Sequence, residues 1–406
     1  MDELTTIIVG AGIIGLSVAR ELAISATNDS NTKHNITVID IRDKPCTLAS
    51  EACSGILSAR NAPKELQSLF ELASEGWLQI LNDRASTINF RDGENVRLVS
   101  SGNDKSEQIP PSWFQTQKDD IFDTADDTMG RLAPTDFASY LIAECERLGV
   151  TVMLDSAVIA VWRAHESSMA KTIKLLDKSI QHRPFANLVL AAGPWTTEIF
   201  KTLYPRNSVD PENHVCCIPW YRTTLSHPMN SPDDIALIHT FLAAKSDDLE
   251  PEVTFSARAS SQTVTIAATP QRIEVKDLHP NDAIDPVADL RTQRAILALK
   301  QAAGSCIPGG VQRLETSEFG YSFVSTATEA GLPVIAQVPV EMIGDMEMEG
   351  GLGAGQEQSA VWLCYGFGMF GTALAPGVGK VMARKMKGVE VGVEEAVVGL
   401  KEALFR

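Results

Sequence analysis

The apolar positions of this chain fall into two patterns, short β-branched runs and longer runs with helical spacing. The first strand is predicted at residues 7–9, where Ile7, Ile8 and Val9 follow one another, and a helix is predicted from 14 to about 24. A second strand is predicted at 36–40, after a polar insert at 27–35 that we interpret as an extended loop. A strand, a helix and a second strand in this order predict a βαβ unit with parallel strands.

Similar patterns recur along the chain, with a less regular stretch at 85–129 that contains prolines and an acidic run at 119–127. Hydroxyl or carboxyl side chains are expected to cap two of the later helices: Thr135 or Asp136 caps one, and hydroxyls cap the helix at 196–203. Further elements are predicted as helices at 63–81, 135–148, 196–203, 286–303 and 378–386, and as strands at 150–154, 157–161, 185–192, 236–242, 252–258, 263–268 and 361–365.

The first strand ends at glycines with the spacing G-x-G-x-x-G, formed by Gly10, Gly12 and Gly15. In such a motif the first glycine permits a tight turn, the second leaves no side chain between backbone and a pyrophosphate, and the third lets helix and strand pack closely. The helix N-terminus offers free N–H groups and about half a positive charge to phosphates. Asp40, at the end of the second strand, is placed to accept hydrogen bonds from ribose hydroxyls. The motif predicts a dinucleotide site; the alternative is a βαβ unit without nucleotide, in which Asp40 is a solvated strand end.

The predicted fold class is therefore α/β, with a Rossmann-type nucleotide-binding domain and a second domain built on a mixed, largely antiparallel sheet. The chain of 406 residues is long enough for both. We place the first domain at 1–85, 128–206 and 318–406, and the second at 86–127 and 207–317.

Charge and cysteine content exclude several classes of protein. A net charge of -17 argues against a nucleic-acid partner, which needs clustered Lys and Arg, and against an anionic membrane surface. The 7 cysteines are scattered without C-x-x-C spacing, so we expect reduced thiols and no metal site. No window is long and apolar enough to span a bilayer, and the acidic start Met1, Asp2, Glu3 does not fit a signal peptide. We therefore expect a cytoplasmic protein.

Three later segments place small residues or glycines beside predicted strands. The segment 49–57 is rich in small and hydroxylated residues, and is either a second ligand-binding loop or a surface loop. Residues 190–195 end a strand in Ala, Gly, Pro and Trp. The segment 366–377 is a glycine-rich turn that leads into a helix, a geometry suited to an anion or a polarised oxygen.

In this order the four segments resemble the D-amino acid oxidase/glycine oxidase superfamily of FAD-dependent amine oxidoreductases (the DAO family), over nearly the whole chain. The resemblance implies a glutathione-reductase-like FAD-binding domain, with the ADP half held by the first motif and Asp40. It also implies that the C-terminal helix start faces the flavin O2 carbonyl, where a helix dipole assists reduction. By this likeness FAD is contacted by Gly10, Gly12, Ile13, Ile14, Gly15, Asp40, Ile41, Ser50, Ser54, Gly55, Ile56, Val158, Ala192, Gly193, Trp195, Gly368, Met369, Phe370, Gly371 and Thr372.

The chain departs from the family pattern where relatives bind a substrate carboxylate. Relatives place an Arg shortly before a T-P-D-G-x-P-like turn; here that turn is 326–333, and the preceding residues 321–325 include no Arg. No Lys or Arg occurs between Arg313 and Lys380. Since an unpaired buried carboxylate costs several kcal/mol, a simple α-amino acid bound in the family's manner is not expected.

Other departures concern the flavin. Phe367 stands where relatives often have the His of a G-H-G motif, and Ser322 or Phe323 stands where some relatives attach FAD through a Cys. We therefore expect non-covalent FAD. The strand at 263–266 carries no Lys of the kind that some relatives use to activate oxygen, so the electron acceptor is either molecular oxygen or another molecule.

Four residues are candidates for substrate binding, each with an alternative. Tyr321 and Tyr365 flank segments that should face the flavin, and either bind substrate or pack in the core. Arg258 either supplies the missing positive charge or is a solvated strand-edge residue, and Tyr221 lines either an aromatic pocket or the sheet. No catalytic residue is assigned, because amine oxidation by hydride transfer needs a neutral nitrogen lone pair rather than a strong base.

The sequence thus predicts an FAD-dependent oxidoreductase that oxidises a small-molecule substrate, at a C–N bond of an amine or amino-acid-derived metabolite, by hydride transfer to flavin N5. One alternative is a flavin desaturase or oxidative cyclase of secondary metabolism, which fits the missing carboxylate anchor. The other is a flavin-binding scaffold without turnover.

Overall fold

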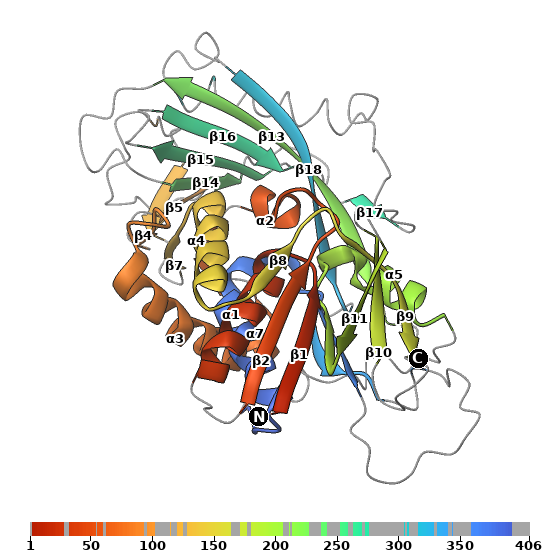
Figure 1. The fold of residues 1–406 in the computed structure, drawn as a ribbon. Coiled ribbons are helices and arrows are strands. Elements are labelled where there is room, and N and C mark those ends of the chain that lie inside the picture. The colour runs from red at the N-terminus through yellow and green to blue at the C-terminus, as the bar shows by residue number, and fades with distance from the viewer. Residues whose placement is uncertain are drawn as a thin grey trace.

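The computed structural model of the chain is drawn in Figure 1. It describes residues 2–27, 32–53, 55–59, 62–92, 96–101, 114, 120–124, 128–163, 171–176, 180–205, 211, 213–226, 237–241, 252–258, 263–269, 273–275, 304, 307, 316–328, 331–339, 343 and 359–391.

A six-stranded sheet in the order β19-β20-β12-β1-β2-β8 forms the centre of the fold. All its neighbouring pairs are parallel except β19, which runs antiparallel to β20. Buried parallel strands are apolar on both faces, and β1 shows this: Ile8 packs on one side of the sheet, and Ile7 and Val9 on the other. The strands are β1 (Asp2–Val9), β2 (Thr32–Ile39), β8 (Thr151–Met153), β12 (Asn187–Leu190), β19 (Val334–Gln337) and β20 (Ala360–Tyr365).

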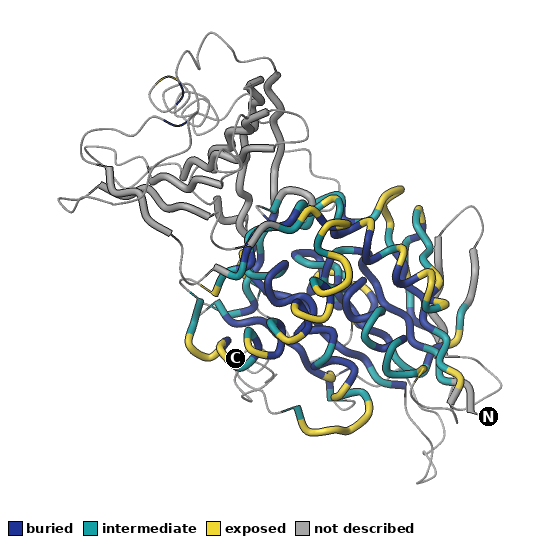
Figure 2. The backbone as a smooth tube through the Cα atoms, turned by 90° about the vertical axis from the view of Figure 1, so that its left-hand side faces the viewer, coloured by how far each residue is buried: buried dark blue, intermediate teal, exposed yellow. Residues whose placement is uncertain are grey.

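Helices and a small sheet cover the two faces. The cluster that contains Ile8 includes residues of α1 (Ile13–Thr27), α3 (Gln67–Arg84), α4 (Pro134–Arg147) and α7 (Gly371–Met386). The cluster on the other face includes Phe200 of α5 (Thr196–Leu203), together with residues of β9 (Ala157–Arg163) and β11 (Ile180–Phe185), which form a three-stranded sheet with β10 (Lys171–Leu176). Figure 2 shows the buried positions concentrated between these layers.

The last helix, α7, lies directly on the first one. A Cβ atom at Gly379 of α7 would be 2.6 Å from the carbonyl oxygen of Ser17 in α1, and one at Gly377 would be 2.8 Å from the amide nitrogen of Ala73 in α3. Trp77 of α3 donates its indole N–H to the carbonyl of Ala373 at 2.8 Å. The contacts at Gly377 and Gly379 require glycine, because any larger residue at these positions would push the helices apart.

A second, larger sheet has the order β17-β13-β16-β15-β14-β5-β6, with β18 paired to β13. All its pairs are antiparallel except β5 with β14. Its strands are β5 (Val96–Ser101), β6 (Asp120–Thr124), β13 (His214–Ser226), β14 (Leu237–Phe241), β15 (Glu252–Arg258), β16 (Thr263–Thr269), β17 (Ile273–Val275) and β18 (Thr316–Thr326).

Beside it, β3 (Ile56–Ser58), β7 (Thr128–Arg131) and β4 (Arg91–Asp92) form a small sheet. Strand β18 starts in the large sheet, and its last residue, Thr326, bridges to Phe367 after β20. The domain boundaries at 85, 127, 206 and 317 stay a prediction.

Several local predictions are wrong. Strand β2 begins at Thr32 and pairs with β1 from Asp2 onward, so much of the insert at 27–35 is strand rather than loop. The predicted caps are absent: α4 is preceded by Ala133 and α5 by Trp195, neither with a side-chain capping bond. Part of the acidic run at 119–127 is β6. The helix predicted at 286–303 lies outside the described residues.

The last helix also starts earlier than predicted, at Gly371 rather than at 378, with Pro376 inside it. Proline usually breaks a helix because its ring crowds the preceding turn and it lacks an N–H. Here the ring packs against Gly76 of α3, where a Cβ atom would come within 2.6 Å of the Pro376 side chain. The tertiary contact therefore keeps the proline within the helix.

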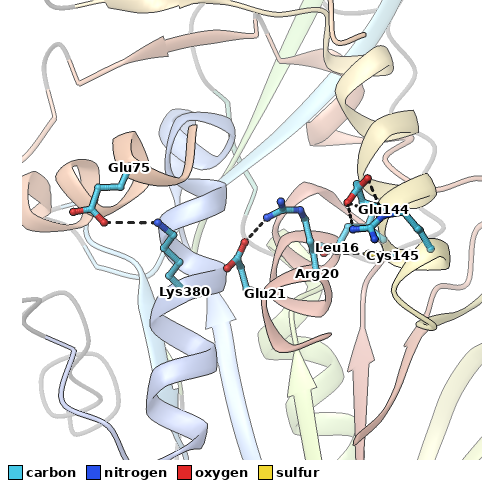
Figure 3. Close-up of polar contacts among 8 residues, drawn as sticks. Leu16, Arg20, Glu21, Glu75, Glu144, Cys145 and Lys380 are labelled. Atoms are coloured by element: carbon cyan, nitrogen blue, oxygen red, sulfur yellow. Dashed lines mark hydrogen bonds and ion pairs between the residues drawn. The ribbon is translucent and has the colours of Figure 1, made fainter. Parts of the chain in front are cut away.

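Ion pairs join the helices of the outer layer (Figure 3). Lys380 Nζ of α7 lies 3.7 Å from Glu75 Oε2 of α3, and Glu21 of α1 pairs with the neighbouring Arg20. Burial raises the pKa of Glu21, while Arg20 and Lys380 act in the opposite direction. None of these residues belongs to the glycine-bearing segments described below.

We predict that Gly379→Val lowers the free energy of unfolding by about 2–3 kcal/mol, because the new side chain would overlap the Ser17 carbonyl in α1. Urea unfolding followed by circular dichroism measures this. The control is Arg384→Ala, an exposed position on the same helix, which we expect to change stability by less than about 0.5 kcal/mol. Wild-type stability for Gly379→Val would contradict the close helix contact.

Candidate cofactor site

The turn after β1 is formed by a direct approach of two backbones. Gly10 has φ of 113°, and a Cβ atom there would overlap the carbonyl oxygen of Ala191, just after β12. The Gly10 N–H donates to the carbonyl of Ile39 at 2.8 Å, and the Ala191 N–H donates to that of Val9 at 2.8 Å. A Cβ at Gly15 would in turn overlap the Gly10 carbonyl. Both glycines therefore have the roles that their spacing predicts, a left-handed turn and close helix–strand packing.

Asp40 is held at the end of β2 by two backbone donors. Its Oδ2 accepts the Ala11 N–H at 2.7 Å and its Oδ1 accepts the Arg42 N–H at 2.9 Å. Each carboxylate oxygen has a second lone pair, so the group can still accept hydrogen bonds from a ligand hydroxyl. Ile41, next to it, is 59% exposed and offers an apolar surface beside this carboxylate.

The segment after β2 folds back onto the glycine turn. Ser50, in the short helix α2 (Ala49–Ala52), accepts the Ile13 N–H at its Oγ, 3.1 Å away. Gly55 has φ of 72°, and a Cβ there would overlap the Leu132 carbonyl. Three neighbouring residues of the glycine turn and of this segment are half-buried, namely Gly12, Ile14 and Ile56. Ser54 lies outside the described residues.

The C-terminal glycine turn reaches the same place. Gly366 has φ of 85° and packs against Ala327, and Gly368, with φ of 56°, opens the 3-10 turn Gly368–Phe370. Gly371 then starts α7, and the hydroxyl of Thr372 lies 3.1 Å from Cys53 Sγ. The start of α7 is thus in contact with the segment that also contacts the start of α1.

Of two side chains in this turn, one is exposed and the other packs against the core. Met369 is 56% exposed, and the half-buried ring of Phe370 meets Phe70 edge-on at 5.7 Å.

Trp195 carries an unused donor at the end of β12. The side chain is only 9% exposed, and its Nε1 has no hydrogen-bond partner among the described residues. The ring meets Phe323 of β18 edge-on at 5.5 Å. Gly193, two residues earlier, has φ of 56° and nothing within 4 Å of its Cβ position, and Ala192 is half-buried. Because a buried unpaired N–H costs about 1–3 kcal/mol, this donor points to a partner outside the described residues, such as a bound ligand.

Parallel topology explains why these segments meet. Strands β1, β2, β12 and β20 run in the same direction, so the residues that follow each of them lie at one edge of the sheet. Ligands of open α/β sheets bind at this carboxyl edge. Val158 lies on β9 instead, half-buried against the cluster that contains Val9 and Ile39.

A model of the FAD dependent oxidoreductase family (DAO) matches residues 5–385. This chain belongs to the DAO family of FAD-dependent oxidoreductases. FAD is therefore its cofactor, and the chain is an oxidoreductase.

Solved structures agree on the fold at low sequence identity. The chain is similar to NikD, an unusual amino acid oxidase essential for nikkomycin biosynthesis (13% identity, 98% of both chains, TM-score 0.70). It is also similar to L-proline dehydrogenase from P. horikoshii, with 14% identity over 98% of this chain and 97% of that chain and a TM-score of 0.67. A third similar structure is glycine oxidase from Bacillus cereus, with 15% identity over 99% of this chain and 98% of that chain and a TM-score of 0.63. A comparison with curated protein sequences found no match.

The residues at this edge fit FAD. A pyrophosphate needs backbone N–H groups without obstructing side chains, a ribose needs an acceptor, and the ring system needs donors and a helix N-terminus. The glycine turn, Asp40, the unpaired Trp195 N–H and the start of α7 offer these groups. We therefore propose that the FAD contacts predicted from the sequence, from Gly10 to Thr372, form one site in this DAO-family protein.

The predicted substrate residues lie on four different strands. Tyr365 is 0% exposed in the core cluster of Phe200, which favours packing. Tyr321, Tyr221 and Arg258 belong to strands β18, β13 and β15, and their side chains are outside the description. The pairing register puts positions 221 and 321 on one face of the large sheet and position 258 on the other, so it does not bring Arg258 together with the tyrosines.

Sequence reasoning missed Cys53 as a member of the site. It lies within the segment 49–57, but a single cysteine among small residues gave no signal of a partner 319 residues away.

In the described part of the chain, no helix combines the length and apolar character needed to cross a membrane.

We predict that Asp40→Asn weakens FAD binding by about 10-fold to 100-fold, because hydrogen bonds to a charged acceptor contribute about 1.5–3 kcal/mol. Fluorescence titration of the apoprotein with FAD measures the dissociation constant. The matched control is Asp43→Asn, an exposed carboxylate three residues further on, for which we expect unchanged affinity. An equal loss in both variants would show that Asp40 acts only through net charge.

We also predict that acid precipitation releases all of the flavin into the supernatant. Phe323, one of the two residues in the place where some relatives carry a flavin-linked Cys, is buried against Trp195 and has no group that could form such a bond. Absorbance of supernatant and pellet measures the distribution. Flavin retained in the pellet would indicate a covalent link elsewhere.

Proposed function

We propose that this protein oxidises a C–N bond of an amine or amino-acid-derived metabolite. The substrate carbon gives up a hydride and the nitrogen lone pair forms a C=N bond, so that an amine becomes an imine when the nitrogen proton passes to solvent. When bound, FAD supplies the acceptor for that hydride at its N5 atom. Molecular oxygen or another acceptor then takes up the two electrons.

Membership of the DAO family supports the general reaction, and the names of similar enzymes support the substrate class. Glycine oxidase, iminodiacetate oxidase and L-proline dehydrogenase are named for nitrogen-bearing substrates. At 13–15% identity these likenesses establish the fold, so the C–N chemistry is carried to this chain as a proposal.

The chain's own contribution is positioning and electrostatics. The N-terminus of α7, which has no side-chain cap among the described residues, presents N–H groups and the positive end of the helix dipole, which stabilises negative charge gained by a bound group. Phe323, buried edge-on against Trp195, excludes water from that place. A neutral amine already has the lone pair that drives hydride loss, so no strong base is required.

The observation that carries the substrate assignment is the absence of a cation. The described side chains along 323–328 and 366–372 are apolar, hydroxyl-bearing or glycine, and the sequence has no Lys or Arg from 314 to 379. A free carboxylate buried there would find no cation in these segments, and an unpaired one costs several kcal/mol. We therefore infer a substrate without a free carboxylate next to the reacting carbon.

The same observation favours a second candidate, a flavin desaturase or oxidative cyclase of secondary metabolism. Such an enzyme acts on a larger intermediate, which binds through apolar contacts rather than through a carboxylate anchor. NikD, an unusual amino acid oxidase of nikkomycin biosynthesis, has a TM-score of 0.70 to this chain.

We predict that amines and amino acid amides reduce the bound flavin at least about tenfold more efficiently than the amino acids with the same side chain, because the carboxylate lacks a cation. Anaerobic stopped-flow mixing, followed as bleaching of the yellow flavin absorbance, gives the rate at each substrate concentration. Each amide and its acid form a matched pair that differs only in the charged group.

Faster reduction by the free acids would contradict the substrate assignment. A product with a new C=C bond, which mass spectrometry detects as the loss of two hydrogens, would favour the desaturase. Absence of bleaching with amines, amides and larger cyclic intermediates alike would favour a scaffold without turnover. Peroxide formation in air distinguishes oxygen from other acceptors.

A further inference from the structure

Cys53 connects three segments of the proposed FAD site through its thiol. Its Sγ lies 3.1 Å from the Ser50 carbonyl oxygen and 3.1 Å from Thr372 Oγ1. Ser50 uses its own hydroxyl to accept the Ile13 N–H at 3.1 Å. The start of α1, the segment around α2 and the start of α7 are therefore joined in one hydrogen-bonded chain.

The direction of each bond in this chain follows from proton counting. Burial raises the pKa of Cys53, so the group is a neutral thiol with one proton. The Ser50 carbonyl can only accept, and it therefore takes the S–H proton. The sulfur can then only accept from Thr372, whose hydroxyl proton must point at Cys53. The Thr372 oxygen keeps its lone pairs for any other neighbour.

We propose that Cys53 is a positioning residue of the FAD site, which holds the Thr372 proton so that Thr372 presents only acceptor lone pairs to the cofactor. The inference deepens the proposed function and rests on it only through the placement of FAD at the start of α7. Thr372 is 7% exposed, and it follows the first residue of α7. Its hydroxyl is thus beside the helix N-terminus, where the direction of one O–H dipole affects the charge that a neighbouring group gains.

Removal of the thiol should free this proton. In Cys53→Ala the Thr372 hydroxyl can turn and donate to the cofactor, and an added donor stabilises negative charge gained on reduction. We therefore expect Cys53→Ala to shift the reduction potential of the bound FAD in the positive direction. Cys53→Ser should keep the wild-type potential, since a hydroxyl donates to the Ser50 carbonyl and accepts from Thr372 as the thiol does.

The test is the two-electron reduction potential of each holoprotein, measured by equilibration with reference dyes, together with its visible spectrum. The variants are Cys53→Ala, Cys53→Ser, Thr372→Val and the double variant Cys53→Ala/Thr372→Val. In the Thr372→Val background no hydroxyl proton remains, so Cys53→Ala should cause no further shift. The matched control is Cys145→Ala, another buried thiol, which donates to the Leu16 carbonyl at 3.5 Å from α4 and should leave the potential unchanged.

A shift in Cys53→Ala that disappears in the Thr372→Val background, with Cys53→Ser unchanged, supports the proposal. The proposal is overturned if Cys53→Ala keeps the wild-type potential, if its shift persists in the Thr372→Val background, or if Cys53→Ser shifts equally. If Cys53→Ala does not fold, the comparison of Cys53→Ser with Cys145→Ala decides: a shift in Cys53→Ser overturns the proposal, and a wild-type potential supports it. The dyes report the potential without any amine, so a failure of amine turnover leaves this result intact.

Discussion

The close approach of the Gly10 backbone to Ala191 is the contact on which the remaining structure depends. It brings the ends of β1 and β12 together so tightly that even a methyl group would overlap a carbonyl oxygen. Gly15 then presses α1 onto the same turn, and Gly379 allows α7 to lie on α1. In this way residues from the beginning and the end of the chain reach one edge of the sheet. Backbone contacts of this kind tolerate little displacement, because there are no flexible side chains between them to adjust.

The site built on these contacts binds a charged cofactor with few charges of its own. Among the described residues of the converging segments, Asp40 is the charged side chain that faces the glycine turn, and it is negative. Positive potential must come from the N–H groups and dipoles at the starts of α1 and α7. Such fixed partial charges need no reorganisation when a ligand binds, and this suits a protein whose net charge is -17. Ser50 accepts an N–H at the start of α1, so the segment around α2 is oriented by the same helix end.

The sequence predicted best those features that depend on backbone shape. Gly10 and Gly15 are recognisable because no other residue fits their positions, and the strand ends follow from the apolar runs before them. It failed where tertiary contacts override local preference. Pro376 indicated a later helix start, yet packing against Gly76 keeps it inside α7. The caps were misplaced because Thr135 and Asp136 already belong to the first turn of α4. The hydrogen bond between Cys53 and Thr372 could not be predicted from the sequence, since it depends on the distance in space between two segments that are far apart along the chain.

The substrate side of the site follows a different physical logic from the cofactor side. The residues before the turn at 326–333, where the family resemblance implies a cation, include no Arg, and Phe323 among them is buried edge-on against Trp195. An aromatic ring at that place excludes water and lowers the local dielectric, which makes an unpaired carboxylate still more costly. The same exclusion of water favours a neutral amine, because desolvation disfavours the protonated amine and so preserves the lone pair needed for hydride loss. We therefore propose that the missing anchor and a preference for an uncharged nitrogen have a common cause, the absence of charge from these buried segments. A site that selects in this way discriminates by the cost of burying the wrong charge, and not by an attractive contact to the right one.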